Sequence, residues 1–281
     1  MKNEAAPHPS PDARPGLSAL KRRIALLERA ASPQAEEATA PTLAWGIESI
    51  DRHLPGGGLG LGALHEIAGA GADLEEASLA AVVTARLLGR AQRGRSGHAL
   101  WIARQRDLYA RALPASSCDP ARFLHLHTRR NEDTLWAIEE ALRCRGLVAV
   151  IGEVGMLDLT QSRRLQLAAE KSGVPAFIIR RGRNAVQARS WAVQPIAAHT
   201  RWRIHPAPSI GIATHQQPLP GTARWQIELW RCRGGRPGSW LVEETEHGWR
   251  EATLPLPVAA ALAERPLVAA SDTREPKLKA G

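Results

Sequence analysis

The chain alternates short apolar runs with amphipathic ones, and this alternation limits what it can fold into. The run from Leu147 to Ile151 has no polar side chain, as expected of a strand that is buried on both faces. The expected strands are 64–68, 98–103, 123–127, 147–151 and 176–180. The stretches between them have helical spacing at 75–90, 106–112, 131–144 and 159–171. Strands that alternate with helices form a mostly parallel sheet flanked by helices, so the sequence predicts an α/β domain.

From Arg201 the pattern changes to extended segments without a helical period. Apolar and polar residues alternate in three of them, 202–205, 224–230 and 239–242. Such alternation is typical of antiparallel strands that have one solvated face. We expect these segments, in a β-rich part of about 201–253, to extend one edge of the sheet.

We expect one core domain, residues 43–255, with polar and proline-bearing ends. Residues 1–42 are predicted to be disordered apart from one amphipathic helix at about 17–30. The apolar stripe of this helix is Leu17, Leu20, Ile24 and Leu27. The helix either packs on its own domain or binds a partner protein, and its sequence allows both. Residues 256–281 are predicted to form a flexible tail.

Composition narrows the class of protein further. No apolar run reaches the roughly 18 residues of a membrane-spanning helix, and the first residues lack the apolar core of a signal peptide. We therefore expect a soluble, cytoplasmic protein that binds no membrane. The three cysteines form no C-x-x-C pair, which argues against disulfide scaffolds and zinc ribbons. His125 and His127 would share one face of a strand without a cysteine or carboxylate cluster, so the sequence predicts no metal site and no cofactor.

Residues 69–76, Gly-Ala-Gly-Ala-Asp-Leu-Glu-Glu, lie between an expected strand and an expected helix, where a phosphate-binding loop would be. Such a loop follows G-x-x-x-x-G-K-[ST], in which backbone N–H groups and the lysine bind phosphate and the hydroxyl binds Mg²⁺. Gly69 can supply the first glycine, but Leu74, Glu75 and Glu76 occupy the other three positions. Two carboxylates in place of a cation and a hydroxyl would repel a triphosphate. The sequence thus predicts a degenerate P-loop.

Positive charge is concentrated in one segment of the chain. Residues 180–236 contain ten arginines, no lysine and one acidic residue, so their formal charge of +9 equals that of the whole chain. Six of the nine tryptophans lie in or just beyond this segment. Arginines interleaved with aromatic rings suit contacts with phosphates and stacked bases. The alternative is that the tryptophans fill the core while the arginines form a solvated face.

Residues 45–67 carry the most specific likeness to a known family. Their sequence, Trp-Gly-Ile-Glu-Ser-Ile-Asp-Arg-His-Leu-Pro-Gly-Gly-Gly-Leu-Gly-Leu-Gly-Ala-Leu-His-Glu-Ile, resembles the stretch that leads into the first strand and phosphate loop of the RecA recombinase core. The likeness covers roughly residues 43–210. It implies a RecA-like fold of the P-loop NTPase type.

The departures from the RecA pattern fall on catalytic positions. The glutamate that activates water in RecA-type ATPases corresponds to Gln105, which cannot act as a base. The Walker B strand resembles residues 147–151, and the position of its Mg²⁺-linked aspartate is Gly152, with Glu153 one residue later. Because phosphoryl transfer depends on these groups, the resemblance implies a protein without ATPase activity.

A RecA-like core without a usable P-loop, preceded by a basic amphipathic helix and followed by a Trp/Arg-rich end, resembles the ImuA family. The segments that carry this likeness are Gly-Gly-Gly-Leu-Gly-Leu-Gly at 56–62, Ala-Val-Ile-Gly-Glu-Val at 149–154 and Phe-Ile-Ile-Arg-Arg at 177–181. The resemblance implies an accessory protein of SOS-induced mutagenesis and translesion synthesis. Its implied partners are ImuB, a polymerase-like protein, the error-prone ImuC polymerase complex and the RecA filament.

Two segments correspond to the DNA-facing loops of RecA, about 155–161 and 182–199. Single-stranded DNA is therefore a further implied ligand. The candidate DNA- or partner-binding residues are Arg180, Arg181, Arg183, Arg189, Trp191, Arg201 and Arg203.

Two other functions remain open from the sequence. One is a RecA-family ATPase with an atypical nucleotide site, which Mg-ATP would stabilise. The other is a cell-division inhibitor similar to SulA, which resembles the same RecA core. The length of the chain and its Trp/Arg-rich end count against the inhibitor.

Overall fold

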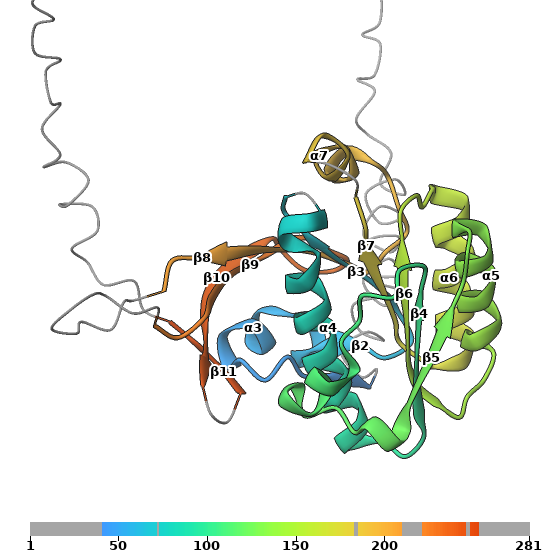
Figure 1. Ribbon diagram of the computed structural model, residues 1–281, viewed down its shortest axis with the longest axis horizontal. Coiled ribbons are helices and arrows are strands. Elements are labelled where there is room, and N and C mark those ends of the chain that lie inside the picture. The colour runs from blue at the N-terminus through green and yellow to red at the C-terminus, as the bar shows by residue number, and fades with distance from the viewer. Residues whose placement is uncertain (1–40, 72, 183–184, 210–220, 246–247, 253–281) are drawn as a thin grey trace, which may run out of the picture.

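The computed structural model of the protein describes residues 41–252, apart from 72, 183–184, 210–220 and 246–247 (Figure 1). The helix predicted at about 17–30 lies outside the described residues, as does the tail predicted at 256–281. Both therefore stay predictions.

The centre of the main sheet is parallel, as the alternation of strands and helices predicts. Its strands are β3 (Leu64–Gly69), β4 (His98–Ala103), β5 (Phe123–His127), β6 (Leu147–Val154), β7 (Ala176–Arg180) and β8 (Thr200–Ala207). Strand β3 is parallel to both of its neighbours, β7 and β8, and the sheet continues through β6 and β4 to β5 at the edge. Every residue of β6 and β7 is buried, because helices cover both faces there.

Helices flank this parallel part on opposite faces (Figure 1). Helix α4 (Asp73–Gly94) packs on one face, and α5 (Asn131–Leu142) and α6 (Leu159–Ser172) pack together on the other. Helix α6 begins with a capping box, in which Gln161 N donates to Asp158 Oδ1 at 2.7 Å and Asp158 N donates to Gln161 Oε1 at 3.0 Å. No helix among the described residues is long and apolar enough to span a membrane.

Three strands extend the sheet beyond β8: β9 (Arg224–Cys232), β10 (Gly238–Thr245) and β11 (Gly248–Glu251). Each is antiparallel to its neighbour, so the described sheet has the order β11-β10-β9-β8-β3-β7-β6-β4-β5. Trp202, Trp225 and Trp240 are buried in the core that α4 shares with this part of the sheet. For these tryptophans the structure favours the alternative in which they fill the core.

The RecA-like segment before β3 packs against these buried tryptophans. It contains β1 (Thr42–Leu43), α3 (Glu48–His53) and β2 (Leu59–Gly60). Asp51 ties the segment together, because its two carboxylate oxygens accept from Trp45 N at 2.6 Å and from Gly46 N at 2.9 Å. The Trp45 ring then lies 4.6 Å from the Trp202 ring, centroid to centroid. The segment thus joins the first strand of the core to the antiparallel half of the sheet.

The structure differs from the sequence-based expectation at several elements. The helix predicted at 106–112 is wrong: a 3₁₀ helix, Ala110–Ser116, follows instead, with Pro114 inside it. Proline lacks the N–H that an α-helix would need there. The segment predicted as a loop at 182–199 contains α7 (Ala185–Val193). The pattern also gave no indication of α3 and β11.

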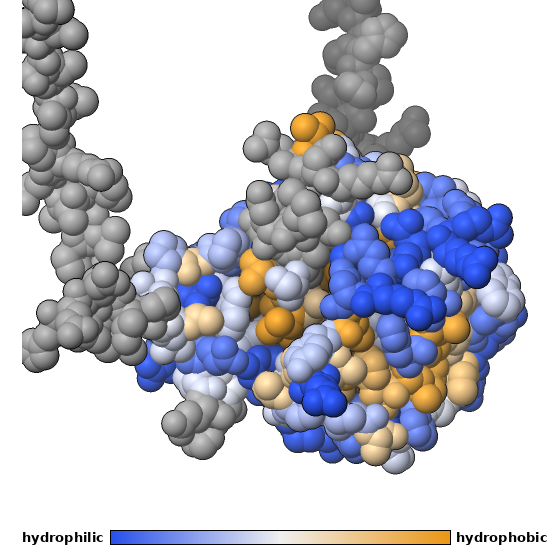
Figure 2. Space-filling model, viewed as in Figure 1, coloured by the Kyte–Doolittle hydropathy of each residue, from blue (hydrophilic) through white to orange (hydrophobic). Residues whose placement is uncertain are grey.

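The parallel part of the sheet ends in the exposed strand β5. Leu124 and Leu126 are 46% and 41% exposed, and the surface where β5 lies is largely apolar in the space-filling view (Figure 2). His125 and His127 alternate with them on the other face of the strand. Among the described residues, no group of three or more His, Cys, Asp and Glu side chains could hold a metal ion.

Candidate functional site

The segment that corresponds to a P-loop lies between a strand and a helix, as the sequence predicts. Gly69 is the last residue of β3, and α4 begins at Asp73. Leu74, Glu75 and Glu76 therefore belong to the first turn of α4, and their side chains lie outside the described part. N–H groups at the start of a helix attract anions, which acidic residues in that turn would counteract. The degenerate chemistry of this loop stays a prediction from the sequence.

Gly152 and Glu153 face opposite sides of the sheet near the end of β6. Gly152 faces α5, where an added Cβ atom would come within 2.1 Å of Ile138 Cδ1, so a larger residue would force Ile138 to move. Glu153 faces the α4 side, and the pairing of β6 with β7 continues past it without a bulge. The carboxylate of Glu153 therefore reaches the α4 face of the sheet, one residue after Gly152, the position that the resemblance to RecA indicates.

The carboxylate of Glu153 is already held by donors from the protein. Trp101 Nε1 donates to Oε1 at 2.7 Å, and Arg181 Nη1 donates to Oε2 at 2.9 Å. The Glu153 side chain is 3% exposed. A metal ion or a reacting water would have to displace the guanidinium, which would separate a buried positive charge from its buried counter-charge. The geometry is that of an internal ion pair.

Arg181 links Glu153 to the loop that follows β4. Its Nη2 donates to Asp107 Oδ2 at 2.6 Å and also to the amide oxygen of Gln105. Two residues predicted for the degenerate nucleotide site, Gln105 and Glu153, thus meet through an arginine predicted to contact DNA or a partner. The Arg181 side chain is 10% exposed, so these contacts enclose most of it.

A hollow with a volume of about 450 Å³ opens beside this ion-pair network. We call it the α4 hollow; its walls come from α4 and from residues 105–116. Its apolar lining is Ala81, Val82, Ala85, Leu108, Ala112 and Leu113. Tyr109 also lines it and is 68% exposed. The α4 hollow can hold an apolar group next to a charged one, because Asp107, Glu153 and Arg181 line it as well.

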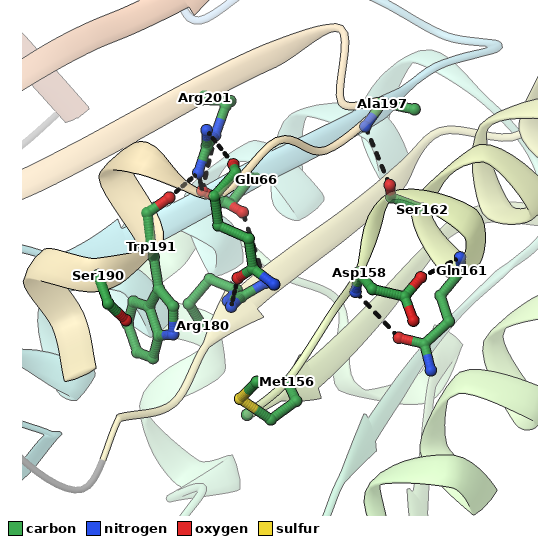
Figure 3. A network of polar contacts seen from close by, with 12 residues as sticks. Glu66, Met156, Asp158, Gln161, Ser162, Arg180, Ser190, Trp191, Ala197 and Arg201 are labelled. Carbon is green, nitrogen blue, oxygen red and sulfur yellow. Dashed lines mark hydrogen bonds and ion pairs between the residues drawn. The ribbon is translucent and has the colours of Figure 1, made fainter.

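A second, buried polar network surrounds the side chain of Glu66 on β3 (Figure 3). Arg201 donates from Nε and Nη2 to Glu66 Oε1, at 3.0 and 2.9 Å, and Arg180 Nη1 lies 3.8 Å from Oε2. The three side chains are at most 5% exposed. Burial lowers the pKa of Arg180, and the neighbouring Glu66 carboxylate acts against this shift. These arginines neutralise a buried carboxylate. The sequence-based expectation that Arg180 and Arg201 lie on a surface that binds DNA or a partner is therefore corrected: both side chains are buried.

Trp191 belongs to the same network rather than to a stacking surface. The Arg180 guanidinium lies 4.8 Å from the centroid of the Trp191 ring, and the Trp191 carbonyl oxygen accepts from Arg201 Nη2 at 2.5 Å (Figure 3). The Trp191 side chain itself is 4% exposed. The network therefore ties α7 to the end of the parallel sheet.

The remaining predicted arginines divide into two groups. Arg183 and the side chain of Arg189 lie outside the described part. Arg203 lies on β8 with its guanidinium 3.3 Å from the centroid of the Trp230 ring, and its side chain is 26% exposed. Of the predicted set that the structure describes, Arg203 keeps the largest exposed fraction.

The sequence pattern does not single out Glu66, Trp101 or Asp107. Glu66 could have been found from the sequence, because a carboxylate in a strand expected to be buried needs a cationic partner. Trp101 and Asp107 carry none, because their roles depend on which strand ends meet in the fold.

Comparison with known proteins identifies the family. No protein-family model matches the chain. The chain is 40% identical over 239 residues to Protein ImuA of Caulobacter vibrioides, in each of two strains. The match covers 83% of this chain and 95% of each relative. Identity of this extent, over nearly the whole relative and not just one motif, shows that the chain belongs to the ImuA family.

Proposed function

We propose that this chain is a non-catalytic accessory protein of SOS-induced, error-prone translesion DNA synthesis. Its family membership links it to the ImuA, ImuB and ImuC mutagenesis system. In this proposal the RecA-like core is a scaffold that contacts ImuB and brings it together with the RecA filament and the ImuC polymerase complex. The protein acts in the cytoplasm and hydrolyses no ATP.

The observation that carries the proposal is the ion pair between Glu153 and Arg181. A Walker B carboxylate acts by holding a Mg²⁺ ion, whereas this one binds a guanidinium and an indole N–H. Gln105, at the position of the activating glutamate, is an acceptor for the same arginine. Together with the acidic residues Glu75 and Glu76, these contacts support a retained fold whose nucleotide chemistry has been lost.

Single-stranded DNA is a further proposed ligand, with fewer candidate residues than the sequence indicates. Arg180 and Arg201 are buried against Glu66. Arg203 and Arg231 lie on β8 and β9 with exposed or partly exposed side chains. Such groups support binding that weakens as salt rises. If the purified protein shows no salt-dependent affinity for single-stranded DNA at low ionic strength, DNA is not a ligand.

Co-purification with ImuB and RecA, with and without ATP, tests the proposal. We expect ImuB to be captured equally in both conditions, because no bound nucleotide is needed to form the scaffold. Capture that requires ATP would favour the ATPase alternative. Capture of a tubulin-like division protein, with none of ImuB, would favour the SulA-like alternative.

A further inference from the structure

The α4 hollow leaves apolar side chains at the surface of an otherwise well-packed face. Leu113 is 3% exposed, whereas Val82 is 37% and Tyr109 is 68% exposed. Exposed apolar surface that surrounds a hollow of this size marks a place where another molecule binds. Among the residues that the structure describes, none covers Val82 and Tyr109.

The charge of the α4 hollow is opposite to that of the protein. Its described lining has two carboxylates, Asp107 and Glu153, and one guanidinium, Arg181, whereas the whole chain has a formal charge of +9. Both carboxylates share the Arg181 guanidinium, at 2.9 Å for Glu153 and 2.6 Å for Asp107, but Glu153 is 3% exposed whereas Asp107 is 51% exposed. The carboxylate that an occupant meets is therefore Asp107. A cation gains from this contact, and a phosphate or another carboxylate is repelled.

We infer that the α4 hollow docks a segment of a partner protein that combines an apolar or aromatic side chain with a lysine or arginine. The apolar side chain packs between Val82 and Tyr109, and the basic one pairs with Asp107. This inference rests on the proposed function, because it names the surface by which the scaffold holds its partner. Nucleic acid does not fit, since its phosphates would approach the exposed carboxylate of Asp107.

Tyr109 gives a direct readout, because it is the one tyrosine of the chain. Full-length protein labelled with 3-fluorotyrosine has a single fluorine resonance, which reports on the α4 hollow. Titration with ImuB should shift this resonance as the complex forms on gel filtration. A complex that forms without a shift leaves the scaffold proposal standing and overturns the docking site.

Two substitutions in the lining test the two halves of the inference. Ala112→Trp fills the α4 hollow from an exposed position, and Asp107→Lys reverses its charge. Each should weaken ImuB binding by about tenfold or more, as expected for the centre of an interface. The matched controls are Ala121→Trp and Glu132→Lys, which are exposed and lie outside the lining, and they should bind as the unchanged protein does. Equal binding by all four variants overturns the inference.

If ImuB does not bind at all, the proposed function fails and two peptides decide the inference. Acetyl-Leu-Trp-Arg-Arg amide should shift the fluorine resonance, and acetyl-Leu-Trp-Glu-Glu amide should not. A shift with neither peptide overturns the site, as does a shift with Mg-ATP or with single-stranded DNA. In the full chain, the reversal of Lys21, Arg22 and Arg23 to glutamate should leave the resonance unchanged. A change there would mean that the chain's own basic segment is the occupant.

Discussion

His65 Nδ1 lies 2.8 Å from the hydroxyl oxygen of Thr200, across the pairing of β3 with β8. Trp202 Nε1 donates to the same oxygen at 2.7 Å, which leaves the proton of the hydroxyl available for His65 Nδ1. His65 Nε2 lies 2.9 Å from the carbonyl oxygen of Gly60, which can only accept. Nε2 therefore carries a proton, and because burial lowers the pKa of His65 to about 3, the imidazole is neutral at pH 7 and Nδ1 accepts from Thr200.

Acid should destabilise the fold through His65. Burial lowers the pKa of His65 from 6.5 to about 3; the Gly60 carbonyl acts against this shift, and His199 adds to it. Below pH 6.5 only the unfolded chain gains a proton here, so the contribution of His65 is complete above that pH and is lost as the pH falls toward 3. At pH 5 we expect unfolding in urea to show a loss of about 2 kcal/mol relative to pH 7.5.

The substitution His65→Gln identifies the residue responsible. It removes the titrating group, so the free energy of unfolding should change less between pH 7.5 and pH 5 than in the unchanged protein. His98→Gln, at an exposed position, should keep the original pH dependence. If both variants have the same pH dependence, His65 is not the source.

Glu153→Gln should destabilise the protein by about 2 kcal/mol, because Arg181 loses its buried counter-charge and keeps only the half-exposed Asp107. The amide oxygen of the glutamine can still accept from Trp101 Nε1, so the change isolates the charge. Adding Arg181→Met removes the guanidinium that has lost its buried counter-charge and should restore part of the stability. Urea unfolding measures all three proteins. Asp133→Asn breaks an exposed ion pair with Arg130 and should have little effect.

If Glu153→Gln proves as stable as the unchanged protein, the ion pair contributes nothing. That result would contradict the structural role given to the Glu153–Arg181 pair.

The parallel core could be predicted from the sequence because its signal is local. Strands β6 and β7 are buried at every residue, and each begins with an uninterrupted apolar run, 147–151 and 176–179. Helix α7 could not be predicted in the same way, because what holds it in place is the contact of Trp191 with Arg180 and Arg201. Such contacts join segments whose meeting no local pattern reveals.

The candidate site could be predicted only in part. The resemblance to RecA points to Gln105 and Glu153 one at a time, and the charge pattern makes Arg181 a candidate for binding DNA or a partner. The structure joins all three, although Gln105 and Arg181 are 76 residues apart in the chain. Whether an arginine lies in solvent or against a carboxylate depends on strand order, which charge patterning does not encode.

Arg201 and Arg231 should respond differently to the same substitution. Arg201→Met leaves Glu66 with a single distant cation, and we expect a loss of about 3 kcal/mol in unfolding free energy. Arg231 is exposed, so Arg231→Met should change stability by less than about 0.5 kcal/mol. If the protein binds single-stranded DNA, Arg231→Met should weaken that binding, and folded Arg201→Met should not. Fluorescence anisotropy with labelled DNA measures this, and weaker binding by Arg201→Met alone would contradict the buried role.

Mg-ATP should leave the melting temperature of the protein unchanged. A ligand present at a hundred times its dissociation constant would add about 2.7 kcal/mol to the stability, a shift that thermal unfolding resolves easily. The double variant Glu75→Lys, Glu76→Thr replaces two carboxylates with the cation and hydroxyl of a working loop. Removing about 1 kcal/mol of repulsion should strengthen ATP binding at least about fivefold, measured by titration calorimetry at low salt. Glu132→Lys is the charge control, and ATP binding as tight in the unchanged protein as in the double variant would show that the loop is not degenerate.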